Sequence, residues 1–342
     1  LENAVIFSIV SGKLRSLKRM PATLTGLAYT AYRGRHRVMN RAWTARPTPT
    51  LDKYSRDLTD LARLEKVGFL TGHKEEYEKL ADVLSRADRP NAILVGEEGI
   101  GKGTIIAHLA FRIVRDRVPE PLFDKRLVQL NIGELAAGAP PEELRARAQK
   151  IIDEIIAAGN IILFIPDIHQ LAKTGGGLSL ADIFLPAIKE GAFSVIGTTY
   201  QEDFKDVIVK RGDFTGAFEI INVSEISPSD AIKVLSYQSI ILEKQYRVIA
   251  SFGAIKKAVE IARRYFGDKP LPGSAELLLK EAFADARENK KAALAPEDVI
   301  RIAERKTNIP LRGVDGGEAK ALLNLEEEIH KRLIDQEEAV TE

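Results

Sequence analysis

Residues 91–112 constrain the possible folds of this 342-residue chain more than any other stretch. Four apolar residues lead into GEEGIGKGT, which runs from Gly96 to Thr104, and a helical apolar pattern follows. A strand, a glycine loop and a helix in this order are the context of a phosphate-binding loop. Glycines let backbone N–H groups converge on phosphate oxygens, while a helix N-terminus and a lysine add positive charge. The residues expected to contact a nucleotide here are Gly96, Gly99, Gly101, Lys102 and Gly103.

The magnesium contact of such a loop is displaced in this sequence. The spacing G-x-x-x-x-G-K is intact, but Gly103 follows the lysine where a Ser or Thr hydroxyl would reach Mg²⁺. Thr104 comes one residue later, and one helical step turns a side chain by about 100°. Thr104 is the candidate for contacts to both nucleotide and magnesium. The alternative is a bare strand-to-helix turn that binds no phosphate.

Composition excludes several kinds of site. The chain has no cysteine, which removes disulfides, thiolate metal sites and cysteine nucleophiles together. Its five histidines are scattered along the sequence, which argues against a histidine-built metal site. Hydrophobic content of 45% and charged content of 29% are ordinary for a globular protein, and the length suggests about two domains. A cytoplasmic location is expected.

The net charge of +1 hides a basic N-terminal arm. Residues 1–46 carry nine Lys or Arg and one acidic residue, Glu2. Such an arm can lie on nucleic acid or anionic lipid, or it can be a solvated linker. The apolar run 4–10 is far shorter than the roughly twenty residues of a membrane span. Because the chain begins at Leu1 and not at Met, we expect it to be an excised fragment. A membrane span could lie upstream of Leu1. We expect the arm to be poorly packed and to face an acidic partner such as an anionic membrane surface.

Hydrophobic periodicity divides the rest of the chain into two classes of structure. Up to about residue 226, apolar strands alternate with helices, which predicts an α/β fold with a doubly wound parallel sheet. Beyond that point the pattern is helical only. The expected strands are near 92–95, 127–131, 161–165, 194–198 and 218–223, and the expected helices are 51–62, 75–84, 142–157, 184–189, 230–242, 252–264, 274–289, 296–306 and 319–334.

Several segments together resemble the first ATPase module of Clp-type AAA+ unfoldases. They are TPTLDKYSRDLTDLA, GEEGIGKGT, NIILFIPDIHQL, LPAIKEGAFSVIGTT, LPGSAELLLKEAF and KALLNLEEEIHKRLIDQEEAV, and they cover roughly residues 47–342. The resemblance implies a basic arm at 1–46, an AAA+ large α/β domain at 47–226, a small helical domain at 227–310 and a connector at 311–342. It further implies a hexameric ring, ATP bound between subunits and threaded protein substrates. The partners it implies are a second ATPase module, a protease and client proteins.

The resemblance also identifies the catalytic positions, where this chain departs from the family pattern. The family has Asp-Glu at the end of the third strand, and here Pro166-Asp167 stands in that place. A single carboxylate cannot both hold the magnesium shell and polarise water. Asp167 is the candidate catalytic residue, or else it caps the following turn. Thr199 matches the polar residue that contacts the terminal phosphate.

Three further family features are missing from the sequence. Gly216 and Ala217 replace two arginines that reach into the neighbouring site, and such an arginine is worth roughly 10³ to 10⁵ in rate. Lys210 and Arg211 lie nearby and are expected to be solvated loop charges. The substrate-gripping loop at 138–143 lacks an aromatic residue. In the helical domain, Gly273 and Ser274 stand where the family has charged residues.

These departures favour a degenerate module, a pseudo-ATPase that keeps nucleotide binding and has impaired hydrolysis. It would bind ATP or ADP, with Mg²⁺ accompanying the nucleotide, and act structurally or in regulation. One alternative is an active ATPase that uses Asp167 as base and Thr104 for magnesium. Another is a phosphotransferase like the nucleoside-monophosphate kinases, in which the run GKGT also occurs.

Overall fold

The computed structural model describes residues 46–64, 70, 72–173, 179–267, 269–309 and 311. The described residues all belong to one compact unit of the chain. Apart from Arg46 and Leu311, the predicted arm and connector lie outside the described residues. The helix predicted at 319–334 does so as well. Within the described part, no helix combines the length and hydropathy needed to cross a membrane.

A six-stranded sheet forms the centre of the α/β part, in the order β1-β3-β4-β5-β2-β6. All neighbouring strands pair in parallel except β1, which runs antiparallel to β3 at one edge. The strands are β1 (Ser55–Asp57), β2 (Ala92–Val95), β3 (Arg126–Leu130), β4 (Ile161–Ile165), β5 (Ser194–Thr199) and β6 (Glu219–Asn222). This order places β2, which leads into the glycine loop, between β5 and β6.

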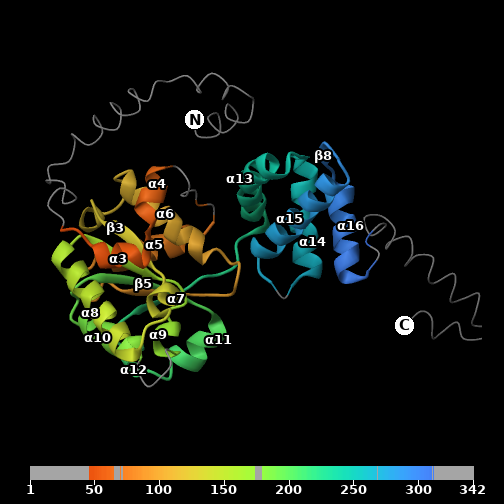
Figure 1. Cartoon of the computed structure of the whole chain (residues 1–342). Coiled ribbons are helices and arrows are strands. Elements are labelled where there is room, and N and C mark those ends of the chain that lie inside the picture. The colour runs from red at the N-terminus through yellow and green to blue at the C-terminus, as the bar shows by residue number, and fades with distance from the viewer. Residues whose placement is uncertain are drawn as a thin grey trace, which may run out of the picture. The chain divides into compact units, whose positions relative to one another are not determined.

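Helices cover both faces of this sheet (Figure 1). They are α3 (Pro49–Lys53), α4 (Leu58–Arg63), α5 (Lys74–Ser85), α6 (Lys102–Val114), α7 (Ile132–Ala136), α8 (Pro141–Ala158), α9 (Gln170–Lys173), α10 (Leu180–Lys189), α11 (Gln201–Asp203) and α12 (Gly212–Thr215). Two short turns, η4 (Glu120–Leu122) and η5 (Phe204–Ile208), complete the connections. Helices α4, α5 and α6 lie on one side, and α8, α9 and α10 on the other.

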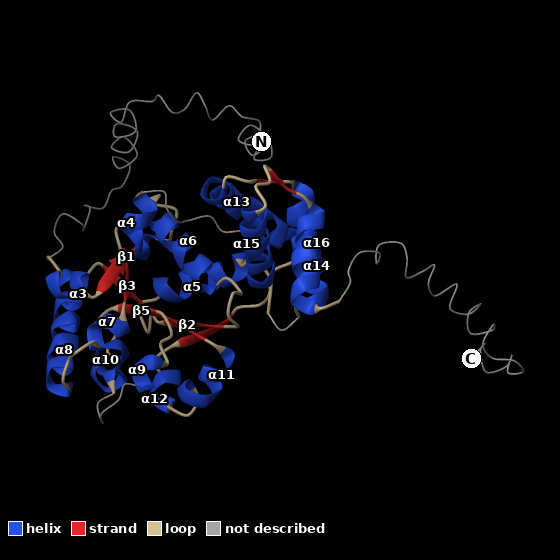
Figure 2. Ribbon diagram, turned by 45° about the vertical axis from the view of Figure 1, so that its right-hand side comes forward, coloured by secondary structure: helices blue, strands red, loops and turns tan. Residues whose placement is uncertain are grey.

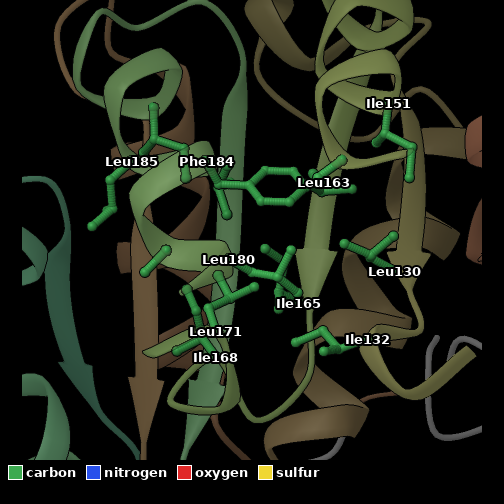
Figure 3. Close-up of a cluster of buried hydrophobic side chains, with 14 of the residues drawn as sticks. Leu130, Ile132, Ile151, Leu163, Ile165, Ile168, Leu171, Leu180, Phe184 and Leu185 are labelled. Carbon is green, nitrogen blue, oxygen red and sulfur yellow. The ribbon is translucent and has the colours of Figure 1, made fainter. Parts of the chain in front are cut away.

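Alternate residues of each strand enter different hydrophobic cores, as the period of two requires. In β4, Leu163 and Ile165 pack with α8 and α10, whereas Ile162 and Phe164 pack with the α5 and α6 side. Figure 3 shows Phe184 of α10 directed toward Leu163 within the first of these cores. The uninterrupted apolar runs of the sequence therefore mark strands that are buried on both faces.

A buried asparagine fixes the start of β2. Asn91 is fully buried, and its side chain accepts from the amide of Val195 at 2.9 Å. Its amide group donates to the carbonyls of Ile188 and Ala217, both at 3.3 Å. Asn91 therefore joins β2 to α10, β5 and the segment before β6, and so holds the strand from which the glycine loop starts.

The described residues between Pro228 and Thr307 form helices and one short two-stranded parallel sheet (Figure 2). The elements are α13 (Pro228–Tyr246), β7 (Ile249–Ala250), α14 (Phe252–Tyr265), α15 (Gly273–Glu288), β8 (Ala293–Leu294) and α16 (Pro296–Thr307). They bury a separate core of aliphatic residues and Phe283. Ion pairs between α15 and α16 join Asp285 to Arg301 and Arg305.

The α/β layer followed by a helical domain confirms the predicted fold class, and most differences concern short elements. The helix expected over 51–62 is interrupted by β1, because Asp57 caps α4 through the amides of Thr59 and Asp60. Asp57 also accepts from Arg126 of β3 at 2.9 Å, which holds β1 at the sheet edge. The predicted helix 184–189 begins four residues earlier, at Leu180. The pair β7 and β8 was not expected from the sequence.

Candidate nucleotide-binding site

The glycine loop lies between the carboxyl end of β2 and the N-terminus of α6. Gly99 and Gly101 adopt φ values of +78° and +111°, in the left-handed region that favours glycine. Ile100 between them has no such conformation. Alternation of this kind turns successive backbone N–H groups toward one side and forms an anion-binding concavity. The loop therefore fits the phosphates of a nucleotide, which Gly96, Gly99, Gly101 and Gly103 would approach through their backbone.

A buried histidine, His73, contacts the backbone of the glycine loop. The ring of His73 lies 2.8 Å from the carbonyl oxygen of Ile100, measured from Nε2. Because a carbonyl oxygen can only accept, Nε2 carries the proton and donates it. A Cβ at Gly101 would lie 2.7 Å from the same nitrogen. Gly101 is thus required for close approach to His73 as well as for its backbone conformation.

Lys102 begins α6 and points its ammonium group back over the loop. Its Nζ donates to the carbonyl of Gly96 at 2.6 Å and to that of Glu97 at 2.8 Å. The same atom lies 4.6 Å from the ring centroid of Tyr200. Burial lowers the pKa of the Lys102 ammonium, although the nearby carboxylates of Asp167, Glu97 and Glu98 oppose that shift. The ammonium therefore lies against the glycine loop, held by two loop carbonyls.

Thr199 ends β5 beside β2, close to the loop. The backbone amide of Gly96 donates to its carbonyl at 3.3 Å, so the sheet register brings the two segments together. The Thr199 side chain is fully buried, and its hydroxyl lies 3.0 Å from Nδ1 of His169. The other nitrogen of that ring, Nε2, lies 3.5 Å from a carboxylate oxygen of Asp203.

Asp167 lies in the turn that follows β4. Its φ of +48° is left-handed, a conformation that aspartate tolerates better than most residues. Its carbonyl accepts from the amide of Gln170 at 2.8 Å, and its own amide donates to the Thr198 hydroxyl at 3.4 Å. The Asp167 backbone thus builds the turn, while its carboxylate acts electrostatically on Lys102. Pro166 offers no second carboxylate here.

Gly103 and Thr104 are both exposed at the start of α6. A Cβ built on Gly103 would meet no other atom within 4 Å, so the position has room for a side chain. The missing hydroxyl is therefore not the result of steric exclusion. Among the described residues, no group of three or more His, Cys, Asp or Glu is arranged to hold a metal ion. Mg²⁺ would accordingly depend on the phosphates, with Thr104 and Asp167 as the protein candidates that the sequence offers.

The segment before β6 cannot supply the arginines that the resemblance implies. Ala217 is 1% exposed, and its carbonyl accepts from Asn91. Arg211 is not the solvated charge that we expected: it pairs with Asp182 at 2.7 Å and with Asp213 at 2.6 Å. Hydrogen bonds that Arg211 donates to the carboxylates of Asp213 and Asp182 raise its pKa. Lys210 does remain an exposed charge, paired with Asp206.

The first residue of α15 lies against the glycine loop. A Cβ on Gly273 would lie 2.8 Å from Cα and 2.9 Å from the carbonyl oxygen of Gly99. Two glycine backbones therefore meet where any larger residue would force them apart. Ser274 is buried, and its hydroxyl donates to the carbonyl of Pro270 at 3.4 Å. The glycine at 273 has a packing role that the sequence did not reveal.

The structure brings together most of the residues that the sequence singled out. Gly96 and Thr199 lie at the adjoining ends of β2 and β5, and Gly99, Gly101 and Lys102 follow in the loop and at the start of α6. Asp167 acts electrostatically on the same lysine. Sequence reasoning missed His73, His169 and Tyr200. A signal existed for the last two, since each lies within two residues of a position already identified. His73 carried no signal beyond its place before an amphipathic helix.

Comparison with known families is consistent with this geometry. The family described as "ATPase family associated with various cellular activities (AAA)" matches residues 92–220. The AAA lid domain matches residues 227–313. A helical AAA lid at this place disfavours the kinase interpretation.

Individual relatives extend the similarity over most of the chain. The ATP-dependent Clp protease ATP-binding subunit ClpC of Staphylococcus aureus (strain USA300) is 30% identical over 358 residues, covering 86% of this chain and 44% of the relative. ClpC of Staphylococcus epidermidis shows the same identity and coverage. The present chain therefore spans less than half the length of these relatives.

Solved structures agree in fold. A closed-state reconstruction of Hsp104 with ATPγS and casein has a TM-score of 0.77 and 31% identity, covering 85% of this chain and 52% of that one. The Hsp104–ADP complex of S. cerevisiae has the same TM-score, with 30% identity. With the glycine loop, the sheet order and the helical lid in place, the chain belongs to the AAA+ family, as a module of the Clp unfoldase type.

Proposed function

We propose that this chain is a nucleotide-binding module of a Clp-like hexameric unfoldase or chaperone, in which binding is kept and hydrolysis is impaired. The observation that supports this most strongly is the contrast within one site. The glycine concavity and Lys102 are in place, whereas Gly103 and Pro166 lack the groups that bind magnesium and activate water. Affinity rests largely on the loop and its lysine, while turnover needs carboxylates and an arginine.

Each binding residue has a defined part in this proposal. The loop amides and the N-terminus of α6 bind the phosphates, and Lys102 exchanges its contacts with Gly96 and Glu97 for phosphate oxygens. A bound Mg²⁺ would neutralise part of the phosphate charge. Thr104 and Asp167 are the residues closest to that role, although Thr104 is displaced by one helical step from the usual position. Asp167 is the remaining candidate base if any hydrolysis occurs.

The role of such a module is structural or regulatory. By similarity to ClpC, whose name describes a protease subunit, the partners proposed are a second ATPase module, a protease and protein clients. The module would hold the ring together while the second module hydrolyses ATP. The basic residues 1–46 would link this ring to an anionic surface. A cytoplasmic location is part of the same proposal.

Calorimetry with ATP and with ADP tests the binding claim. We expect saturable binding that Lys102→Ala weakens by about ten- to a hundredfold, since hydrogen bonds to charged groups are worth about 1.5–3 kcal/mol. Lys79→Ala, which changes an exposed lysine on α5, is the matched control and should bind as the parent does. Absence of binding by the parent protein, or equal binding by Lys102→Ala, would refute the proposal.

A further inference from the structure

We propose that this site selects a nucleoside diphosphate over a triphosphate, because Tyr200 and His169 already engage the two groups that a terminal phosphate would need. The proposal rests on the proposed function, since it concerns the same site. It goes further by naming which nucleotide the resting module holds.

The first of these groups is the ammonium of Lys102. Three partners hold it: the carbonyls of Gly96 and Glu97, and the face of the Tyr200 ring at 4.6 Å. The two carbonyls belong to the loop and must release the lysine for either nucleotide. The Tyr200 ring centroid lies 6.3 Å from that of His169, the partner of Thr199, which the resemblance assigns to the terminal phosphate. A cation over an aromatic face is held by the ring quadrupole, and only the triphosphate has to displace the ring.

The second group is the hydroxyl of Thr199. It is buried and lies 3.0 Å from Nδ1 of His169, while Nε2 of that ring faces Asp203. In the neutral ring, a proton on Nε2 that faces the carboxylate leaves Nδ1 to accept the hydroxyl proton of Thr199. A threonine hydroxyl has one proton to donate. With that proton directed to His169, Thr199 has no donor to offer a phosphate oxygen.

The charge around the site acts in the same direction. Burial raises the pKa of Tyr200, and the carboxylates of Asp167, Glu98 and Asp203 add to that rise. Glu97, Glu98 and Asp167 are likewise the charges that act on Lys102. Each additional phosphate brings further negative charge into this acidic surrounding. A diphosphate meets less of that repulsion and still uses the loop amides in full.

The test compares ADP with ATPγS, a slowly hydrolysed triphosphate, by calorimetry on the whole chain. We expect ADP to bind about three- to thirtyfold more tightly, the ratio that a cation–π contact accounts for. Tyr200→Leu removes the ring and should bring the two affinities together. Tyr200→Phe keeps the ring and is the matched control that should retain the preference. Tyr200 is half-buried, so neither change leaves a large cavity.

A second pair of variants tests the histidine. His169→Leu should free the Thr199 hydroxyl and reduce the ratio of ADP affinity to ATPγS affinity. His169→Asn keeps an acceptor near the position of Nδ1 and should preserve more of that ratio. If ATPγS binds as tightly as ADP to the parent protein, or if Tyr200→Leu leaves the ratio unchanged, the selectivity proposal fails while nucleotide binding stands. If neither nucleotide binds, both this proposal and the proposed function fail.

Discussion

The contact between Gly273 and the glycine loop provides a stringent test of how the site is built. In Gly273→Ala the new Cβ would lie 2.8 Å from Cα and 2.9 Å from the carbonyl oxygen of Gly99. Those neighbours are backbone atoms, which cannot rotate away as a flexible side chain can. Overpacking of this kind typically costs about 1–3 kcal/mol. We therefore expect Gly273→Ala to lower the free energy of unfolding or to move α15 away from the loop.

Gly103→Ala is the matched control, because it adds the same methyl group to another helix that starts near the site. Its Cβ would meet nothing within 4 Å, and replacing glycine in a helix stabilises by up to about 1 kcal/mol. The two variants should therefore differ by about 1–4 kcal/mol in urea unfolding, with opposite signs relative to the parent.

Hydrogen exchange of the loop amides distinguishes the two ways in which Gly273→Ala could act. Faster exchange at Gly99 with little change in stability would show that α15 has moved. If Gly273→Ala and Gly103→Ala unfold alike and exchange alike, then the close approach of the two glycines does not exist in solution and the reasoning is wrong.

Two further perturbations follow from the described contacts. Asn91→Leu leaves the backbone amide of Val195 without its buried hydrogen-bond acceptor. Because each unsatisfied buried group costs about 1–3 kcal/mol, we expect a lower free energy of unfolding in denaturant. An unchanged unfolding midpoint would contradict the role given to Asn91. Burial alone would raise the pKa values of Asp285 and Asp298, but hydrogen bonds and charges from basic partners, Arg301 among them, lower both. A carboxylate with a lowered folded-state pKa contributes stability that is complete above its unfolded pKa of about 4 and is lost as pH falls through its folded pKa. The helical part should therefore unfold in acid below about pH 4, which circular dichroism measured against pH would show. Arg301→Gln should shift that transition to higher pH, and an unshifted transition would count against the network.

The fold was largely predictable because its signals are strong and local. The run 161–165 is apolar at every position, which only a strand covered on both faces or a buried helix allows, and the flanking residues favour a strand. The glycine loop was predictable because Gly101 and Lys102 occupy fixed places in a known spacing. In contrast, β1 depends on Arg126 pairing with Asp57, a contact between residues far apart in the sequence.

The interior of the site was harder to predict for the same reason. His73 lies 27 residues before Ile100, and nothing near it in the sequence indicates that its ring supports the loop. Gly273 looked like a lost contact, whereas in the structure it allows α15 to approach Gly99. Arg211 looked like a solvated charge, yet it is held by Asp182, 29 residues away. Such pairings follow from the fold and have no signature in the local sequence.

Phosphate release from ATP under single-turnover conditions, with the protein in excess, tests the central claim most directly. The account predicts that ATP is bound and recovered intact, because Pro166 and Gly103 supply neither carboxylate nor hydroxyl. The parent and Lys102→Ala should then show the same background release, although only the parent retains the nucleotide. Phosphate release that saturates with protein concentration and is abolished in both Lys102→Ala and Asp167→Asn would contradict the account and establish an active ATPase.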